Sequence, residues 1–220
     1  MHFSFAKEQE LYIPGPSGQL EAVIHQGHED GHFAARELLA IVCHPHPQHG
    51  GTMDNKVVTT LMRTYRDLGI HVIRFNFRGI GKSEGEFDNA VGEVDDLRAI
   101  ITWSQQHLSH MPLLLAGFSF GSSIAAQASY DVIGLRHLTL VAPPVERYPY
   151  DRAGAFPAPL CVIQGDKDER VFAEGVYQWV DKLQSPTELI RYPEASHFFH
   201  GYLTNLKSDL TETLVRQISA

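Results

Sequence analysis

The chain has 220 residues, 43% of them hydrophobic, which is enough to bury one substantial α/β core, so a single domain over residues 1–220 is expected. Its net charge of −8 argues against a general affinity for nucleic acid or for anionic membrane surfaces. No apolar run approaches the roughly 20 residues of a membrane helix, and the first ten residues lack the basic start and long apolar core of a signal peptide. Cys43 and Cys161 both lie inside apolar runs, and buried thiols of this kind favour a reducing compartment. A soluble, cytoplasmic protein is therefore expected.

The first predicted elements are two short strands on either side of a turn. Residues 9–13 and 19–25 flank Pro14-Gly15-Pro16-Ser17-Gly18, which predicts a β-hairpin. From Leu38 onward, short apolar strands alternate with amphipathic helices, a pattern typical of a parallel sheet with helices on both faces. In such open sheets, ligands bind at the carboxyl ends of the strands. These later strands are predicted at 38–43, 70–75, 113–118, 136–141, 160–164 and 187–192, and the helices near 54–68, 91–108, 120–130, 171–183 and 203–218.

The pentapeptide Gly117-Phe118-Ser119-Phe120-Gly121 lies between one of these strands and one of these helices. Strand, Gly-x-Ser-x-Gly, helix is the arrangement of a nucleophile elbow, whose tight turn strains the serine backbone and exposes the hydroxyl. The glycines two residues to either side of Ser119 keep side chains out of this turn. We therefore predict Ser119 to be a nucleophile at the carboxyl edge of the sheet.

A serine hydroxyl is a poor nucleophile, so it needs a general base, and the base needs a group that orients it. Two later strands run into polar loops: the first loop carries Asp166 and Asp168, and the second carries His197 and His200. The order serine, acid, histidine is the one found in α/β-hydrolases. At this level, two carboxylates and two imidazoles compete for the roles of acid and base to Ser119.

Five stretches in register resemble a known family. Gly-Phe-Ser-Phe-Gly at 117–121, Gly-Asp-Lys-Asp-Glu-Arg-Val at 165–171 and Ser-His-Phe-Phe-His-Gly at 196–201 look like the signature loops of α/β-hydrolases. With the stretches at 44–56 and 74–85, the chain is similar to small, capless bacterial serine hydrolases, which are distantly like dienelactone hydrolases. The resemblance implies the α/β-hydrolase fold without a lid domain, and serine-based hydrolysis. It does not imply a substrate.

The resemblance also separates the competing residues. It makes Ser119 the nucleophile, Asp168 the orienting acid and His197 the base. The acid of the family usually lies three residues after the loop glycine, which selects Asp168 and leaves Asp166 as a turn residue. The base comes just before the Phe-Phe pair, so His200 is expected at the rim.

An oxyanion hole needs two backbone N–H groups aimed at the charge that develops in the tetrahedral intermediate. Phe120 follows the nucleophile at the start of a helix and should supply one of them. The second should come from the loop after Cys43, where two prolines have no N–H to offer. His46 between them is the expected donor, in agreement with the family, and Gln48 is the alternative.

Other motifs favour neither a metal nor a cofactor. Six histidines, His25, His28, His32, His44, His46 and His49, suggest a metal site, but prolines separate the last three, and no acidic residue lies close to those three in the sequence. Gly81-Lys82-Ser83 is like part of a phosphate-binding loop, but Asn76 stands where that motif needs a glycine. The cysteines lie within strands rather than at an elbow, so neither is expected to be a nucleophile. We expect no metal and no cofactor.

Residues 142–159 lie where many relatives insert a helical lid, but they are rich in proline and aromatic residues and have no helical periodicity. An open site is therefore expected, with substrate contacts from Tyr148, Phe156 and Phe198, whereas Phe118 is expected in the core. The main hypothesis is a carboxylesterase-like serine hydrolase that cleaves a small ester or thioester through an acyl-enzyme. The alternatives are an amide or peptide hydrolase, a non-catalytic binding module on the same scaffold, and a nucleotide-binding enzyme. The oligomeric state is left open.

Overall fold

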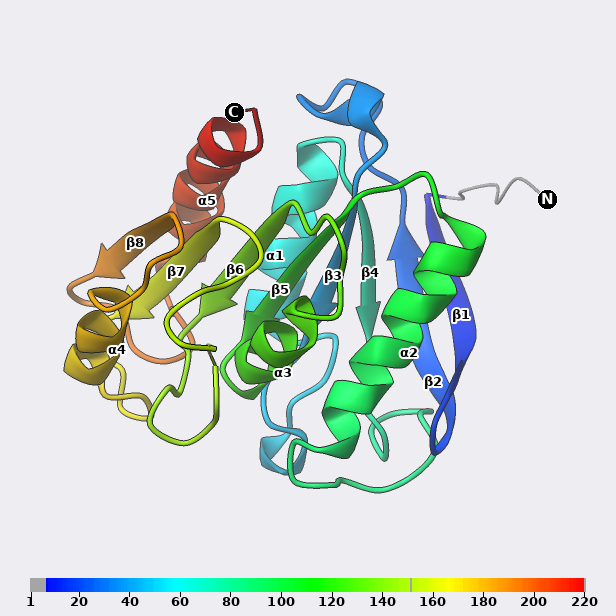
Figure 1. The fold of residues 1–220 in the computed structure, drawn as a ribbon, viewed down its shortest axis with the longest axis horizontal. Helices are drawn as coiled ribbons and strands as arrows, with labels where there is room; N and C mark the ends of the chain where they lie inside the picture. Colours follow the sequence, from blue (N-terminus) through cyan, green and yellow to red (C-terminus); the bar gives the residue numbers. More distant parts are fainter. Residues whose placement is uncertain (1–6, 151, 220) are drawn as a thin grey trace.

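The computed structural model describes residues 7–150 and 152–219, and in them one mixed sheet carries helices on both faces (Figure 1). The strands are β1 (Glu8–Gly15), β2 (Gly18–His25), β3 (Leu39–Cys43), β4 (His71–Phe75), β5 (Leu113–Phe118), β6 (His137–Val141), β7 (Leu160–Gly165) and β8 (Thr187–Tyr192). The helices are α1 (Lys56–Asp67), α2 (Gly92–His107), α3 (Phe120–Ser129), α4 (Ala173–Val180) and α5 (Leu203–Ser219). Each of these elements was predicted, and the bounds differ by a few residues at most. Two single turns of 3-10 helix, at Ala34–Arg36 and Pro47–His49, were not.

The sheet is parallel except at one side. Its strand order is β1-β2-β4-β3-β5-β6-β7-β8. The first two strands form the expected hairpin, with Gly15 paired to Gly18 at the turn, and β2 also runs antiparallel to β4. The pairs from β4 to β8 are all parallel. The predicted fold class, a mostly parallel sheet with an N-terminal antiparallel hairpin, is confirmed.

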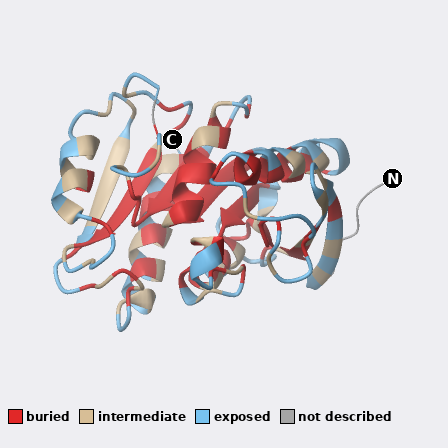
Figure 2. Ribbon diagram, turned by 90° about the horizontal axis from the view of Figure 1, so that it is seen from below, coloured by how far each residue is buried: buried red, intermediate tan, exposed pale blue. Residues whose placement is uncertain are grey.

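Two apolar layers hold the helices on the sheet. Helices α2 and α3 pack on one face over a cluster that includes Phe75, Leu115 and Ile124, while α1 and α5 pack on the other over one that includes Val42, Tyr65 and Leu210. Seen from below, the central strands lie between these helices as a buried layer, whereas the outer strands β1 and β8 are partly exposed (Figure 2). Burial on both faces explains why the strands read as apolar runs rather than as alternating patterns.

The direction of chain progression through the sheet reverses between β3 and β5. From β3 the chain crosses to β4 on one side, and the following strand, β5, lies on the other side of β3. Such a reversal leaves a crevice at the carboxyl ends of the two strands. Cys43 at the end of β3 is paired with Gly117 in β5, so the loop after residue 43 and the turn at Ser119 leave the sheet side by side.

The connection between β6 and β7 contains no helix in its described residues, which are 142–150 and 152–159. The expectation that a helical lid is missing here is met in this described part of the loop. None of the helices formed by the described residues is long and apolar enough to cross a bilayer.

The segment around Gly81-Lys82-Ser83 packs against the hairpin. The Ser83 hydroxyl donates to the carbonyl of Asn76 and accepts the N–H of Glu21, and the Asn76 amide donates to the Glu21 carboxylate. Nearby, the buried Arg78 guanidinium donates at 2.8–3.1 Å to Asp96, whose side chain is fully buried. These contacts give the segment a structural role beside the hairpin.

Two buried histidines, His44 and His137, are predicted to make the fold sensitive to acid. Both are fully buried, and burial lowers the pKa of each to about 4. The unfolded chain takes up these protons near pH 6.5, so between about pH 6.5 and 4 the unfolded state binds more protons than the folded one. The contribution of these two histidines to the free energy of unfolding is therefore fully present above pH 6.5. As the pH is lowered below 6.5, the free energy of unfolding falls by up to about 1.4 kcal/mol per pH unit for each histidine.

The measurement is the free energy of unfolding from urea titrations at pH 7.5, 6.5, 5.5 and 4.5. The variant His137→Asn lacks one titrating group. Its free energy of unfolding should therefore fall less steeply between pH 6.5 and 4.5 than that of the wild type, even if the variant is less stable at pH 7.5. Equal slopes in the two proteins would contradict the assignment.

Candidate active site

Ser119 occupies a strained turn between β5 and α3. Its φ is 53° and its ψ is −120°, in a region that a residue with a side chain rarely adopts. Three hydrogen bonds hold the turn. The Ser119 N–H donates to the Val141 carbonyl at 2.8 Å, and the Ser119 carbonyl accepts both the Ser122 N–H, at 2.9 Å, and the Ser122 hydroxyl, at 2.5 Å. The backbone at Ser119 therefore has the strained geometry that the Gly-x-Ser-x-Gly motif predicts.

The glycines of the motif are required by close backbone approach. A Cβ at Gly117 would lie 2.2 Å from the carbonyl oxygen of Gly121, and a Cβ at Gly121 would lie 2.4 Å from the carbonyl oxygen of His44. Any side chain at either position would push α3 away from β3 and β5. The small residues let the helix begin directly above the crevice between these two strands.

His197 and Asp168 form a buried pair at the carboxyl ends of the last two strands. The His197 Nδ1 lies 2.8 Å from Asp168 Oδ2, and the two side chains are 3% and 0% exposed. Parallel pairing of β7 with β8 aligns Gly165 with Tyr192, so the loops that carry the two residues emerge together. Beneath them, the Phe118 ring is fully buried, as expected, with its centroid 5.0 Å from the imidazole.

The Asp168 carboxylate is held in its charged form. Burial alone would raise its pKa, but the hydrogen bond and charge interaction with His197 lower it, as do the N–H groups of Arg170 and Val171, each 2.8 Å from Oδ1. The outcome is a pKa below the ordinary value for aspartate. Gln164 approaches the other oxygen with its amide nitrogen at 3.3 Å.

The competing residues have other contacts. Asp166, which was predicted as a turn residue, pairs with Arg191 at 2.9 Å and accepts a hydrogen bond from the Tyr177 hydroxyl. His200 is exposed, with its ring 6.1 Å from that of Phe198. Of the two carboxylates and two imidazoles, the pair in contact is Asp168 with His197.

Ser119 and His197 line one small cavity of about 80 Å³. His46, Phe120, Tyr148 and Phe198, all expected at the site, line it as well. Arg170 and Val171 line it too, so the cavity gathers residues that follow five strands, β3, β5, β6, β7 and β8, at the carboxyl edge of the sheet.

The two expected oxyanion donors lie next to this cavity. The His46 and Phe120 rings are 5.0 Å apart, so the loop after β3 packs against the start of α3. Apart from hydrogen bonds within helices and strands, neither the His46 N–H nor the Phe120 N–H donates to a backbone carbonyl of the described residues. Gln48, the alternative donor, is exposed and is not part of the cavity lining.

His44 fixes the path of this loop. Its Nδ1–H donates to the Pro45 carbonyl at 2.7 Å and its Nε2 accepts the Phe77 N–H at 3.0 Å, which together define a neutral tautomer. Its lowered pKa agrees with this assignment. No group of three or more histidine, cysteine, aspartate or glutamate residues in the described parts of the chain is placed to hold a metal ion. Burial raises the pKa of both Cys43 and Cys161, which disfavours the reactive thiolate.

One expected substrate contact is corrected. Phe156 does not line the cavity: it is 9% exposed, its ring stacks on that of Tyr130 at 5.6 Å and it meets Trp179 edge-on at 6.2 Å. Its N–H also donates to the Ser185 hydroxyl, which holds it on the side of the domain near α4. An aromatic residue in an irregular loop has no periodic pattern that would distinguish a substrate contact from core packing.

Several residues of the site were missed in the sequence. Arg147, after β6, and Arg170, after β7, both line the cavity, and Glu169 accepts the His197 N–H at 3.1 Å. Their position just after predicted strands was a usable signal, because every such loop opens at the same edge of the sheet.

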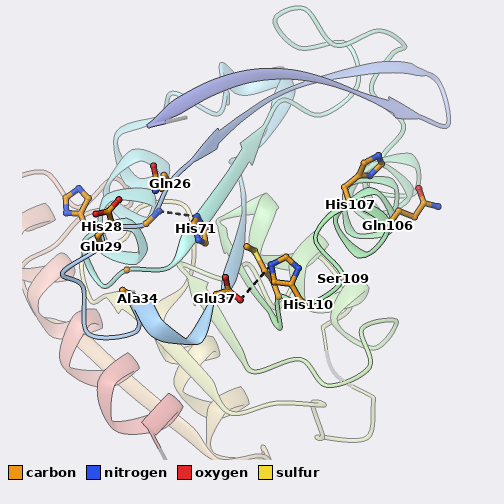
Figure 3. Close-up of a pocket in the computed structure, with 13 residues that line it drawn as sticks. Gln26, His28, Glu29, Ala34, Glu37, His71, Gln106, His107, Ser109 and His110 are labelled. Carbon is orange, nitrogen blue, oxygen red and sulfur yellow. Dashed lines mark hydrogen bonds and ion pairs between the residues drawn. The ribbon is translucent and has the colours of Figure 1, made fainter. Parts of the chain in front are cut away.

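A larger cavity of about 530 Å³ lies at the opposite edge, near the amino ends of β3, β4 and β5 (Figure 3). Polar residues, among them His71, His107, Ser109 and His110, line it, and the His110 imidazole lies 3.9 Å from the Glu37 carboxylate. Neither Ser119 nor His197 contributes to it. Size alone therefore does not select the candidate site, and the strained serine and the buried His–Asp pair distinguish the smaller cavity from the larger one.

Comparison with known proteins agrees with this architecture. A family model described as the alpha/beta hydrolase fold matches residues 48–151. An uncharacterized protein of Rickettsia prowazekii is 36% identical over 215 residues, which cover 94% of this chain and 88% of that protein.

Two solved structures are similar over nearly the whole chain. An alpha-beta serine hydrolase homologue from Coxiella burnetii is 43% identical, with a TM-score of 0.90, and the match covers 96% of this chain and 100% of that one. A serine hydrolase without a lid from Xanthomonas campestris is 39% identical, with a TM-score of 0.91, and the match covers 100% and 99%. The chain therefore belongs to the α/β-hydrolase family, and its relatives there include serine hydrolases that have no lid.

Proposed function

We propose that this protein hydrolyses a small carboxylic ester or thioester through an acyl-enzyme, with Ser119, His197 and Asp168 as the catalytic triad. The observation that carries the proposal is the buried hydrogen bond of 2.8 Å between His197 and Asp168, because that imidazole lines the same cavity as the strained Ser119. Three groups far apart in the sequence thus have the order and surroundings that acyl transfer requires.

The hydrogen bond to Asp168 gives the imidazole its role. With the Nδ1–H donated to the carboxylate, Nε2 carries the free electron pair of the neutral ring. Nε2 accepts the Ser119 proton as Oγ attacks the substrate carbonyl, and the imidazolium that forms is stabilised by the buried carboxylate. It then returns the proton to the leaving alcohol or thiol as the tetrahedral intermediate collapses to the acyl-enzyme.

Deacylation repeats the sequence with water. His197 takes a proton from a water molecule that attacks the acyl-enzyme, and returns it to Ser119 Oγ as the acid product leaves. In both steps the N–H groups of His46 and Phe120 bind the oxyanion, helped by the dipole of α3 at its amino end. The scheme uses only side chains and backbone groups of this chain.

The test is labelling with a fluorophosphonate probe, followed by peptide mapping, together with rates for p-nitrophenyl esters of graded acyl length. The modified residue should be Ser119. Because the cavity is about 80 Å³, against roughly 300–1,000 Å³ for typical ligand pockets, a long chain gains little apolar burial there. We expect kcat/KM for the acetate and butyrate to exceed that for the dodecanoate by at least about tenfold.

The alternatives would give other results. A folded protein that reacts with neither the probe nor any ester would be a binding module on a hydrolase scaffold. Faster turnover of a p-nitroanilide than of the matched p-nitrophenyl ester would favour amide or peptide hydrolysis on the same triad.

A further inference from the structure

The charged side chains in the wall of the active-site cavity are all positive. Arg147 and Arg170 line it, and no aspartate or glutamate among the residues that the structure describes does. This composition is unusual for a chain whose net charge is −8, since an average surface of this protein would present more carboxylates than cations. A cavity lined by one sign of charge attracts ligands of the opposite sign.

Arg147 lies on the lid-free loop after β6, and its side chain is directed by one contact. Its Nη2 donates to the backbone carbonyl of Arg170 at 2.9 Å, which ties the loop after β6 to the loop after β7. In the described part of the chain the Arg147 guanidinium forms no ion pair. Its remaining donors are therefore available to a ligand.

Arg170 is only partly neutralised. Its guanidinium lies over the Phe198 ring, 5.2 Å from the centroid, and its Nε is 3.9 Å from the Glu169 carboxylate. Both members of that pair are about half exposed, at 47% and 56%, so solvent screens the attraction. The second Glu169 oxygen faces the His197 N–H at 3.1 Å. Positive charge thus persists at the cavity on the side of Arg170.

We propose that the substrate carries an anionic group, a carboxylate or a phosphate, close to the scissile carbonyl, and that Arg147 and Arg170 bind this group. The inference rests on the proposed esterase function and narrows it to negatively charged esters. Two guanidinium groups suit such an anion because each can donate two parallel hydrogen bonds to its oxygens. The small volume of the cavity brings the substituent of a bound ester close to its wall, which the exposed Arg147 and Arg170 help to form.

The experiment compares kcat/KM for matched anionic and neutral esters. One pair carries the charge on the acyl group: the 4-nitrophenyl monoester of fumaric acid, whose trans geometry prevents intramolecular attack, and its methyl ester. A second pair carries it on the leaving group: 4-carboxyphenyl acetate and its methyl ester. A third substrate, 4-phosphonooxyphenyl acetate, tests phosphate in place of carboxylate.

In the wild type, at least one anionic ester should be preferred over its neutral partner by about tenfold, and 0.5 M NaCl should reduce that preference. In the double variant Arg147→Met with Arg170→Met, the ratio of kcat/KM for the anionic ester to that for the neutral ester should fall about tenfold. The single variant Arg147→Lys should keep part of the preference for the anionic ester. The matched control is Arg63→Met with Arg136→Met, which removes the same charge from exposed positions outside the cavity lining and should keep the wild-type ratio.

A ratio near one for every pair in the wild type would overturn the inference, as would a ratio that is unchanged in the double variant at Arg147 and Arg170. In both cases, labelling and ester turnover that depend on Ser119 would show that the proposed function stands. Loss of that dependence would instead overturn the proposed function, and the inference with it.

Discussion

Replacing Ser119 by alanine is expected to lower kcat for p-nitrophenyl butyrate by at least about 10⁴-fold and to abolish fluorophosphonate labelling. The hydroxyl is the only group at the elbow that can form the acyl-enzyme in the proposed scheme, so no partial activity through a neighbouring nucleophile is expected. Alanine keeps the Cβ and leaves the three backbone contacts of residue 119 in place. The variant should therefore fold, with a circular dichroism spectrum like that of the wild type.

The matched control for this result is Ser109→Ala. Ser109 is exposed and lines the larger cavity at the opposite edge, where His107 and His110 also lie (Figure 3). This variant should keep both labelling and turnover. If labelling were lost in Ser109→Ala and undiminished in Ser119→Ala, the nucleophile would belong to the larger cavity.

Replacing Asp168 by asparagine is expected to lower kcat by about 10³–10⁴-fold with little change in the fold. An asparagine oxygen can still accept the N–H groups of Arg170 and Val171, but its amide would then face the His197 Nδ1 and favour the wrong imidazole tautomer. The loss should come from both the misplaced proton and the missing negative charge beside the imidazolium.

Asp166→Asn separates this role from a general effect of removing a carboxylate. Asp166 contacts Arg191 and Tyr177 at the rim of the same loop, so its loss should change kcat by less than about threefold. The measurement is kcat and KM against pH for the wild type and both variants. A larger loss in Asp166→Asn than in Asp168→Asn would reverse the assignment of the acid.

The opposite charges of the triad loop and the cavity wall give the site its distinctive character. The carboxylate of Asp168 is buried against the imidazole of His197, whereas Arg147 and Arg170 are exposed and line the cavity. On the proposed function, the buried negative group orients the base, and the exposed positive groups select the substrate.

Local sequence patterns were enough for the fold and for the nucleophile candidate. Alternating apolar strands and amphipathic helices predicted the sheet, because burial of both faces leaves apolar runs that need no knowledge of long-range contacts. The elbow around Ser119 was readable for a similar reason, because Gly117 is required by close backbone approach to Gly121, only four positions away. Gly121 is instead required by close approach to the carbonyls of Cys43 and His44, which only the tertiary structure brings there.

The family resemblance selected Asp168 over Asp166, but the physical reason for this pairing lies in the tertiary structure. Asp166 and Asp168 are two residues apart in one loop, and which of them meets His197 depends on the register of β7 against β8 and on the N–H groups that anchor Asp168. The burial of Phe156 and the place of Arg147 and Arg170 beside the cavity are likewise products of loop packing. Side chains in irregular loops follow no period, so their surroundings are set by contacts between segments that the sequence keeps far apart.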